Sequence, residues 1–226
     1  MVDTEEQRLD IIKYCNLLLN GYLSHFKQTD KSAQGRMITQ LKWLKERAEN
    51  HNLPLPVPRE KLGSLLYIYT NGEMYNIYEY EKPILEQYNI ETIEKIMDRL
   101  ITLTEEGGLL TKKEYFPYIV RVIDALILLI EKSDYNLEGY KIEFINDLRD
   151  IQKHLNENDI DPPLGAFMKY YPSFKLKYKV DDYPLLKKLM LIVYHSIFNG
   201  RRPDNWLTPE DTDRESQKLL DEVIRL

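Results

Sequence analysis

The feature that most constrains this chain is the recurrence of apolar residues three and four positions apart over long segments. A helix needs this spacing to bury one side against a core while its other side faces water. With 43% hydrophobic and 30% charged residues, the composition is that of a folded globular protein rather than a disordered one. The sequence therefore predicts a mainly α protein.

Helices are expected at seven places, over residues 4–28, 32–50, 90–105, 111–131, 137–156 and 185–198, and from 208 onward. Thr4 and Thr208 precede two of these segments and are suited to cap their first turns. The first segment is expected to bury one stripe of apolar residues, namely Leu9, Ile12, Leu19, Leu23 and Phe26. The segment 111–131 is apolar around much of its circumference, so other helices must cover it on several sides. We expect a single-domain helical bundle of about seven helices over residues 1–226.

This domain is expected to have five consecutive parts. They are a helical hairpin at 1–50, a proline- and tyrosine-rich connector at 51–83, central helices at 84–158, an irregular segment at 159–184 and C-terminal helices at 185–226. Prolines at 54, 56 and 58 make the start of the connector extended, since proline lacks an N–H and restricts the residue before it.

Two segments leave a short β element open. Residues 59–83 have helical spacing at Leu62, Leu65, Leu66 and Tyr69, yet Asn71-Gly72 would also suit a β-hairpin over 64–80. We favour the helix, because it joins the surrounding helices without needing a sheet. Between 174 and 180, apolar residues alternate strictly with lysines, which predicts an extended edge strand.

Charge and cysteine content indicate a cytoplasmic protein. The net charge of −6 does not draw the whole molecule to nucleic acid or to an anionic membrane. The only cysteine, Cys15, lies in an apolar helical stretch, where a buried thiol is expected. The acidic N-terminus lacks the pattern of an export signal. The longest apolar run, 125–130, is far shorter than the roughly 20 residues that span a bilayer.

Four polar residues share one face of the predicted helix 137–156, namely Glu143, Asp147, Asp150 and His154. Carboxylate and imidazole ligands on one helix face occur in metal sites of helical bundles. Such sites also need a Glu-x-x-His pair on a second helix, and the sequence has no such pair elsewhere. We therefore expect a solvated acidic face, with no metal and no cofactor.

The same helix contains Arg149-Asp150-Ile151-Gln152-Lys153-His154. This stretch resembles the Arg-x(4–6)-His motif of HEPN ribonucleases. The resemblance covers six residues and implies that His154 transfers a proton at a ribose hydroxyl or leaving group while Arg149 stabilises phosphate charge. In an unbroken helix the two side chains point about 140° apart, so a shared site requires a bend or a second subunit. The alternative is a salt-bridged surface helix.

The segment 169–179 has four lysines and no acid, between acidic helices. Lysines with interleaved aromatics can dock an acidic protein partner or bind single-stranded nucleic acid. They also suit an edge strand whose lysines prevent aggregation. The candidate binding residues are Tyr170, Tyr171, Phe174, Lys175, Lys177, Tyr178 and Lys179.

The sequence carries no other catalytic signature, so we expect a non-enzymatic protein-interaction module. An inhibitor of the immunity or antitoxin type fits, because an acidic protein can mask a basic partner by charge complementarity. The competing hypotheses are a metal-independent ribonuclease using Arg149 and His154, and a nucleic-acid binder using 175–179. The oligomeric state is left open.

Overall fold

The chain folds into helices. A computed structural model describes residues 4–29, 31–70, 90–133, 135, 137, 139–165, 170–174 and 180–226. These residues contain eight helices of eight or more residues and no β-strand, which confirms the predicted mainly α class with one helix more than expected. No helix in these ranges combines the length and the apolar character that crossing a membrane requires.

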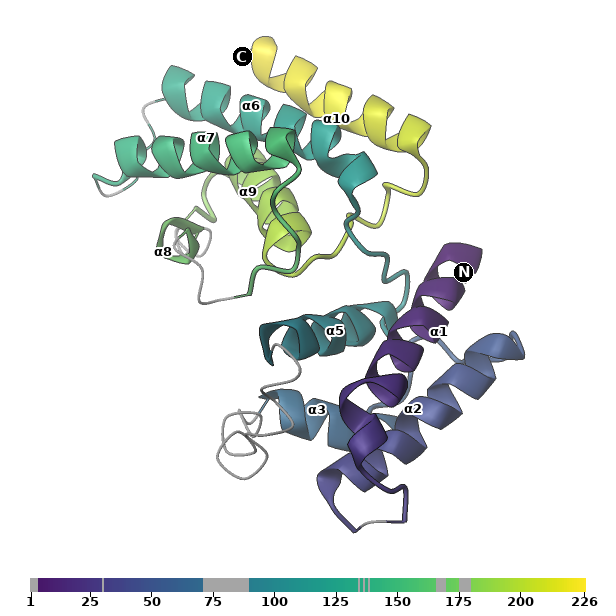
Figure 1. Ribbon diagram of the computed structural model, residues 1–226. Coiled ribbons are helices and arrows are strands. Elements are labelled where there is room, and N and C mark those ends of the chain that lie inside the picture. Colours follow the sequence, from purple (N-terminus) through teal and green to yellow (C-terminus); the bar gives the residue numbers. More distant parts are fainter. Residues whose placement is uncertain are drawn as a thin grey trace. The chain divides into compact units, whose positions relative to one another are not determined.

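The chain divides into two compact units, residues 1–110 and 111–226 (Figure 1). Each unit has a separate cluster of buried hydrophobic side chains. We expected one domain over 1–226. The periodicity that predicts each helix says which of its faces is apolar, but it does not say which helices share a core. The division was therefore not visible in the sequence.

The described residues of unit 1 form four helices and two single 3₁₀ turns. They are α1 (Glu5–Asn20), η1 (Tyr22–His25), α2 (Ala33–Glu49), η2 (Arg59–Lys61), α3 (Gly63–Thr70) and α5 (Ile90–Leu103). α1 packs against α2 and α5, and α3 packs against the same two helices. The predicted helical hairpin at 1–50 is confirmed. The helix predicted from 59 is confirmed over 63–70, so the alternative strand beginning at 65 is wrong, and the rest of that prediction lies outside the described residues.

The buried face of α1 differs from the predicted one. We expected Leu9, Ile12 and Leu19 on the buried stripe, but Leu9 is 51% exposed and the other two are only partly buried. The buried stripe runs through Gln7, Asp10, Ile11, Tyr14, Cys15 and Leu18. Gln7 belongs to it because its side-chain amide donates to the carbonyls of Leu103 and Glu105, 2.8 and 3.1 Å away, at the end of α5. Because Gln7 is buried with its hydrogen-bond partners, the buried face of α1 is rotated away from the one that apolar residues alone predict.

Burial raises the pKa of the Cys15 thiol to about 12, whereas an unfolded thiol titrates near about 8.5. The folded protein therefore keeps this proton while the unfolded chain loses it. The contribution to stability is full below about pH 8.5 and is lost as pH rises toward the folded pKa.

We predict that this thiol makes the free energy of unfolding fall by about 1.4 kcal/mol per pH unit above about pH 8.5. Chemical denaturation of the wild type and of Cys15→Ala at pH 7.5 to 10 measures the slope. Other groups titrate in both proteins, so only the difference between the slopes reports on Cys15. Equal slopes would contradict the prediction.

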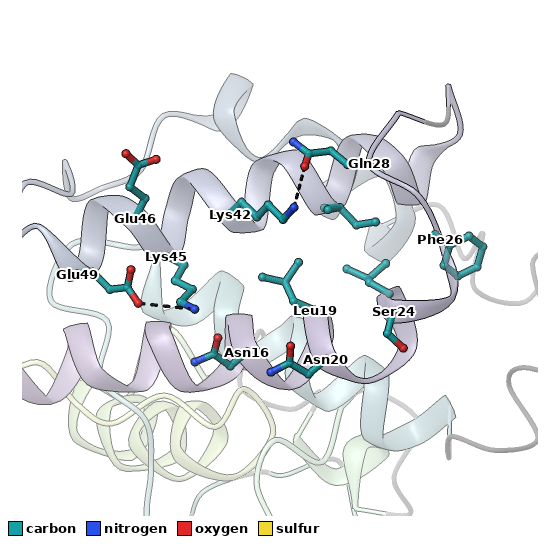
Figure 2. Close-up of a pocket in the computed structure, with 12 residues that line it drawn as sticks. Asn16, Leu19, Asn20, Ser24, Phe26, Gln28, Lys42, Lys45, Glu46 and Glu49 are labelled. Carbon is teal, nitrogen blue, oxygen red and sulfur yellow. Dashed lines mark hydrogen bonds and ion pairs between the residues drawn. The ribbon is translucent and has the colours of Figure 1, made fainter.

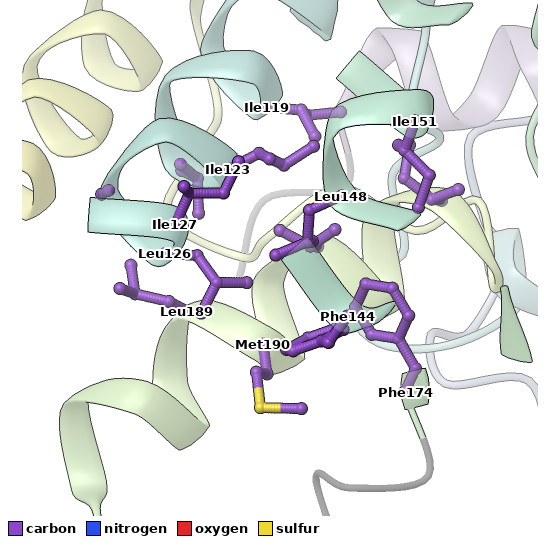
Figure 3. Packing of buried hydrophobic residues seen from close by; sticks show 14 of the residues in the cluster. Ile119, Ile123, Leu126, Ile127, Phe144, Leu148, Ile151, Phe174, Leu189 and Met190 are labelled. Carbon is purple, nitrogen blue, oxygen red and sulfur yellow. The ribbon is translucent and has the colours of Figure 1, made fainter. Parts of the chain in front are cut away.

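Unit 2 is organised around α6 (Phe116–Lys132), which follows the 3₁₀ turn η3 (Lys113–Tyr115). α6 packs against α7 (Lys141–Glu157), α9 (Pro184–Ile197) and α10 (Pro209–Ile224). Figure 1 shows it between α7 and α10. Its central position was predicted from its apolar circumference, and nine of its residues are buried. The core that these helices share includes Ile123, Leu126, Leu148, Leu189 and Met190 (Figure 3).

Two helix boundaries in unit 2 follow from local chemistry. Thr208 caps α10 as predicted, with its side-chain oxygen accepting from the backbone N–H of Asp211, and Pro209 occupies the first turn. α7 ends at Asn158, whose left-handed backbone (φ 55°) suits a C-cap.

The strand predicted from 174 to 180 is wrong at its start, because Phe174 ends the helical turn α8 (Tyr171–Phe174). Residues 175–179 lie outside the described residues.

We predict that Leu148→Ala lowers the free energy of unfolding by about 3–5 kcal/mol, because the fully buried side chain leaves a cavity among α6, α7 and α9. Denaturation followed by circular dichroism measures this loss. The control is Ile142→Ala on the same helix, where the side chain is 76% exposed. A comparable loss in both variants would contradict the packing described here.

Candidate functional site

A groove of about 440 Å³ runs between α1 and α2 in unit 1 (Figure 2). Its apolar lining comes from Leu19, Leu23, Phe26 and Ile38. Leu23 and Ile38 are buried, while Leu19 and Phe26 are partly exposed and pack against the core of this unit. Figure 2 shows Leu19 between the two helices. A ligand can therefore contact the apolar surface of Leu19 and Phe26 without displacing the buried residues of the core.

Polar side chains border this groove along both helices. Asn16 and Asn20 lie on α1, and Lys42, Lys45 and Glu49 lie on α2. Lys42 donates to the side-chain oxygen of Gln28 at 2.8 Å, and Lys45 lies 3.6 Å from Glu49. Both ion-pair partners are partly exposed, so this pair contributes little to stability. It is available to exchange partners with a ligand.

Glu46 adds a second acid at the end of the groove where Glu49 lies. It is exposed, and Figure 2 shows its carboxylate pointing away from α1. No basic group of the described residues forms an ion pair with it. The α2 border is thus formally balanced, but its two acids lie together toward the C-terminal end of the helix.

This groove was not predicted from the sequence. Leu19, Leu23 and Phe26 were expected on the buried stripe of the first helix, which was expected to form a hairpin with the second. The sequence did contain a signal, because Ile11, Cys15 and Leu18 form a second apolar stripe one position away from the predicted one, and this second stripe is the buried one. A pair of adjacent apolar stripes on one helix indicates that one of them is incompletely covered.

The predicted binding segment at 170–179 is only partly described. Tyr170 and Phe174 are buried, at 2% and 0% exposure, so both belong to the core of unit 2 rather than to a surface. The ring of Phe174 contacts those of Phe144 and Phe198, with centroids 5.3 and 5.0 Å apart. The side chain of Tyr171 lies outside what is described, as do Lys175, Lys177, Tyr178 and Lys179.

The acidic face of α7 holds this segment. The hydroxyl of Tyr170 donates to Asp150 Oδ2 at 2.8 Å, and Ser173 donates to Asp147. Both carboxylates are half-buried. The face that we expected to be solvated is therefore partly structural, with two of its four members fixing the turn α8.

We predict that Tyr170→Phe raises amide hydrogen exchange at 170–174, because the half-buried carboxylate of Asp150 loses a hydrogen bond that stabilises the fold by about 1.5–3 kcal/mol. Exchange followed by mass spectrometry measures the change. Tyr140→Phe, at a ring that is 50% exposed, is the matched control. Unchanged exchange in the Tyr170 variant would show that the hydrogen bond to Asp150 does not fix the turn.

Arg149 and His154 have separate partners. Arg149 donates to Glu131 on α6 at 3.0 Å, and both side chains are about half exposed. His154 Nδ1 lies 3.0 and 3.1 Å from the two carboxylate oxygens of Asp159, and its Nε2 lies 3.8 Å from Asp150. Within a single described chain, the structure does not bring the two residues of the Arg-x4-His motif onto a common ligand position.

The partner of His154 was not anticipated. Asp159 follows the end of α7, and the left-handed Asn158 turns the chain back so that the N–H of Asp159 donates to the carbonyl of His154. Glu157 lies three residues after His154 on the same helix. Ligand atoms of these three side chains lie within 4.8 Å of one another. Helical spacing alone pairs His154 with Asp150, and only the C-cap brings in Asp159.

Comparisons with known proteins give no relative of this chain, since no family model, no curated protein and no solved structure matches it.

Proposed function

We propose that this chain is a non-enzymatic protein-interaction module and that the groove between α1 and α2 receives a segment of its partner. The observation that carries the proposal is the partly exposed apolar lining at Leu19 and Phe26, bordered by polar groups. An amphipathic helix docks in such a groove by placing residues three and four positions apart on the apolar floor. Apolar contact provides affinity, and the polar border fixes the register.

The charges at the groove favour a basic segment at one end. Glu46 and Glu49 lie together on α2, and the weak pair between Lys45 and Glu49 can open to admit a basic side chain. The net charge of −6 adds a long-range attraction for a basic partner and increases the rate of encounter. We therefore propose a basic partner, bound in the cytoplasm.

An inhibitor of the immunity or antitoxin type is the specific form of this proposal. A basic toxin that acts on nucleic acid must present cations at its active site, and an acidic protein covers those cations by complementarity. In such a complex, the segment of the toxin that binds in the groove would hold the acidic inhibitor over the active site of the toxin.

The test is photo-crosslinking from a single groove position in the native cell. A photoreactive amino acid at Asn16 is expected to capture a basic protein. Asn20→Arg, which blocks the groove, and Glu49→Lys, which reverses a border charge, should each lower this capture about tenfold, corresponding to about 1.4 kcal/mol. Quantitative mass spectrometry of the crosslinked product measures the change.

The matched control places the same photoreactive residue at Lys188, an exposed position on α9 in unit 2. The same proteins captured from both positions would contradict the groove as the docking site. An acidic protein captured at Asn16 and lost in Asn20→Arg would keep the groove but would contradict the basic partner.

A further inference from the structure

We propose that His154, Glu157 and Asp159 at the C-terminal end of α7 form a binding site for a divalent transition-metal cation of the Zn²⁺ class. This inference is independent of the groove and of the proposed partner. Each of the three residues offers one ligand atom, and these atoms converge to within 4.8 Å of one another. The imidazole supplies a nitrogen ligand and the carboxylates supply oxygen ligands, which is a donor set that Zn²⁺ accepts.

The spacing of the donor atoms fits direct coordination. Ligands at about 2.0–2.2 Å from a tetrahedral metal ion lie about 3.4 Å apart. His154 Nδ1 lies 3.0 and 3.1 Å from the two oxygens of Asp159, slightly less than this spacing, so a small separation of the two side chains admits a cation between them. Glu157 is exposed, so its side chain can rotate to supply the third ligand.

The backbone holds this geometry in place. Asn158 adopts the left-handed conformation (φ 55°), and the N–H groups of Asn158 and Asp159 bond back to the last turn of α7. Asp159 is therefore held beside His154 by the helix cap rather than by a flexible loop. Because the cap is formed by main-chain bonds, the site is organised before a metal binds, which reduces the entropic cost of binding.

The surrounding charges favour a cation. The site lies at the negative end of the dipole of α7. Asp150 Oδ1, 3.8 Å from His154 Nε2, adds a further negative charge on the other side of the imidazole. Lys113 is the opposing cation, and its ammonium group is engaged by the carbonyl of Asn158 at 2.8 Å. The three ligand residues thus form a net anionic site, and the ammonium group of Lys113 is held at a backbone carbonyl.

The stripe Glu143, Asp147, Asp150 and His154 was expected to be a solvated acidic face without a metal. The set proposed here shares only His154 with that stripe. Asp147 and Asp150 accept hydrogen bonds from Ser173 and Tyr170. These two carboxylates are therefore already engaged within the fold, while the carboxylates of Glu157 and Asp159 are exposed.

The experiment titrates the chelator-treated 226-residue protein with Zn²⁺ alone in a calorimeter. We expect one equivalent to bind and expect His154→Ala and Asp159→Asn each to weaken binding by about tenfold or more. Glu157→Gln should weaken it as well. NMR of the histidine ring nitrogens gives a second readout, in which Nδ1 of His154 shifts on addition of Zn²⁺ and the other histidines keep their positions.

The control is His25→Ala, which removes an exposed imidazole in unit 1. Circular dichroism confirms that each variant is folded before titration. Binding that survives in Asp159→Asn, or that weakens equally in His25→Ala, would overturn the proposal and assign the Zn²⁺ to scattered surface histidines. An absence of binding up to about 1 mM Zn²⁺ would overturn it outright.

Discussion

The burial of α6 is the constraint on which the structure of unit 2 depends. Nine of the residues of this helix are buried, and each large apolar side chain stabilises the fold by about 1.5–3 kcal/mol when it leaves water. One packing partner covers only part of a helix, so α7, α9 and α10 must all contact α6. The positions of the polar faces of α7 and α10 follow from this requirement, since each helix turns its own apolar stripe inward.

α7 shows how one helix serves several purposes once its core face is fixed. Ile145, Leu148, Ile151 and Leu155 bury one stripe. On the side of the helix, Asp147 and Asp150 accept hydrogen bonds from Ser173 in α8 and from Tyr170 just before it, and beyond its end the cap places Asp159 beside His154. These acids look alike in the sequence. Their distances from the core and from the helix end decide whether they anchor the chain or remain open to a ligand.

The parts of the candidate sites differ in how far the sequence predicts them. His154 was recognised as a chemically competent residue, but its partner was not, because Asp159 reaches it through the left-handed backbone of Asn158. Leu19 and Phe26 were recognised as apolar, but their partial exposure depends on how closely α2 approaches α1. Tyr170 and Phe174 were expected at a binding surface and are buried instead. Aromatic residues beside lysines suit a surface and a core boundary equally well.

The sequence by itself determined the helical class, most helix positions, the caps at Thr4 and Thr208 and the central place of the 111–131 segment. These are local properties, fixed by residues within a few positions of one another along the chain. The tertiary structure decided that the helices form two units, that Gln7 and Asp10 lie on the buried face of α1, and that a groove remains between α1 and α2. Each of these depends on contacts between residues far apart in sequence, and apolar periodicity carries no information about which partner covers a given stripe.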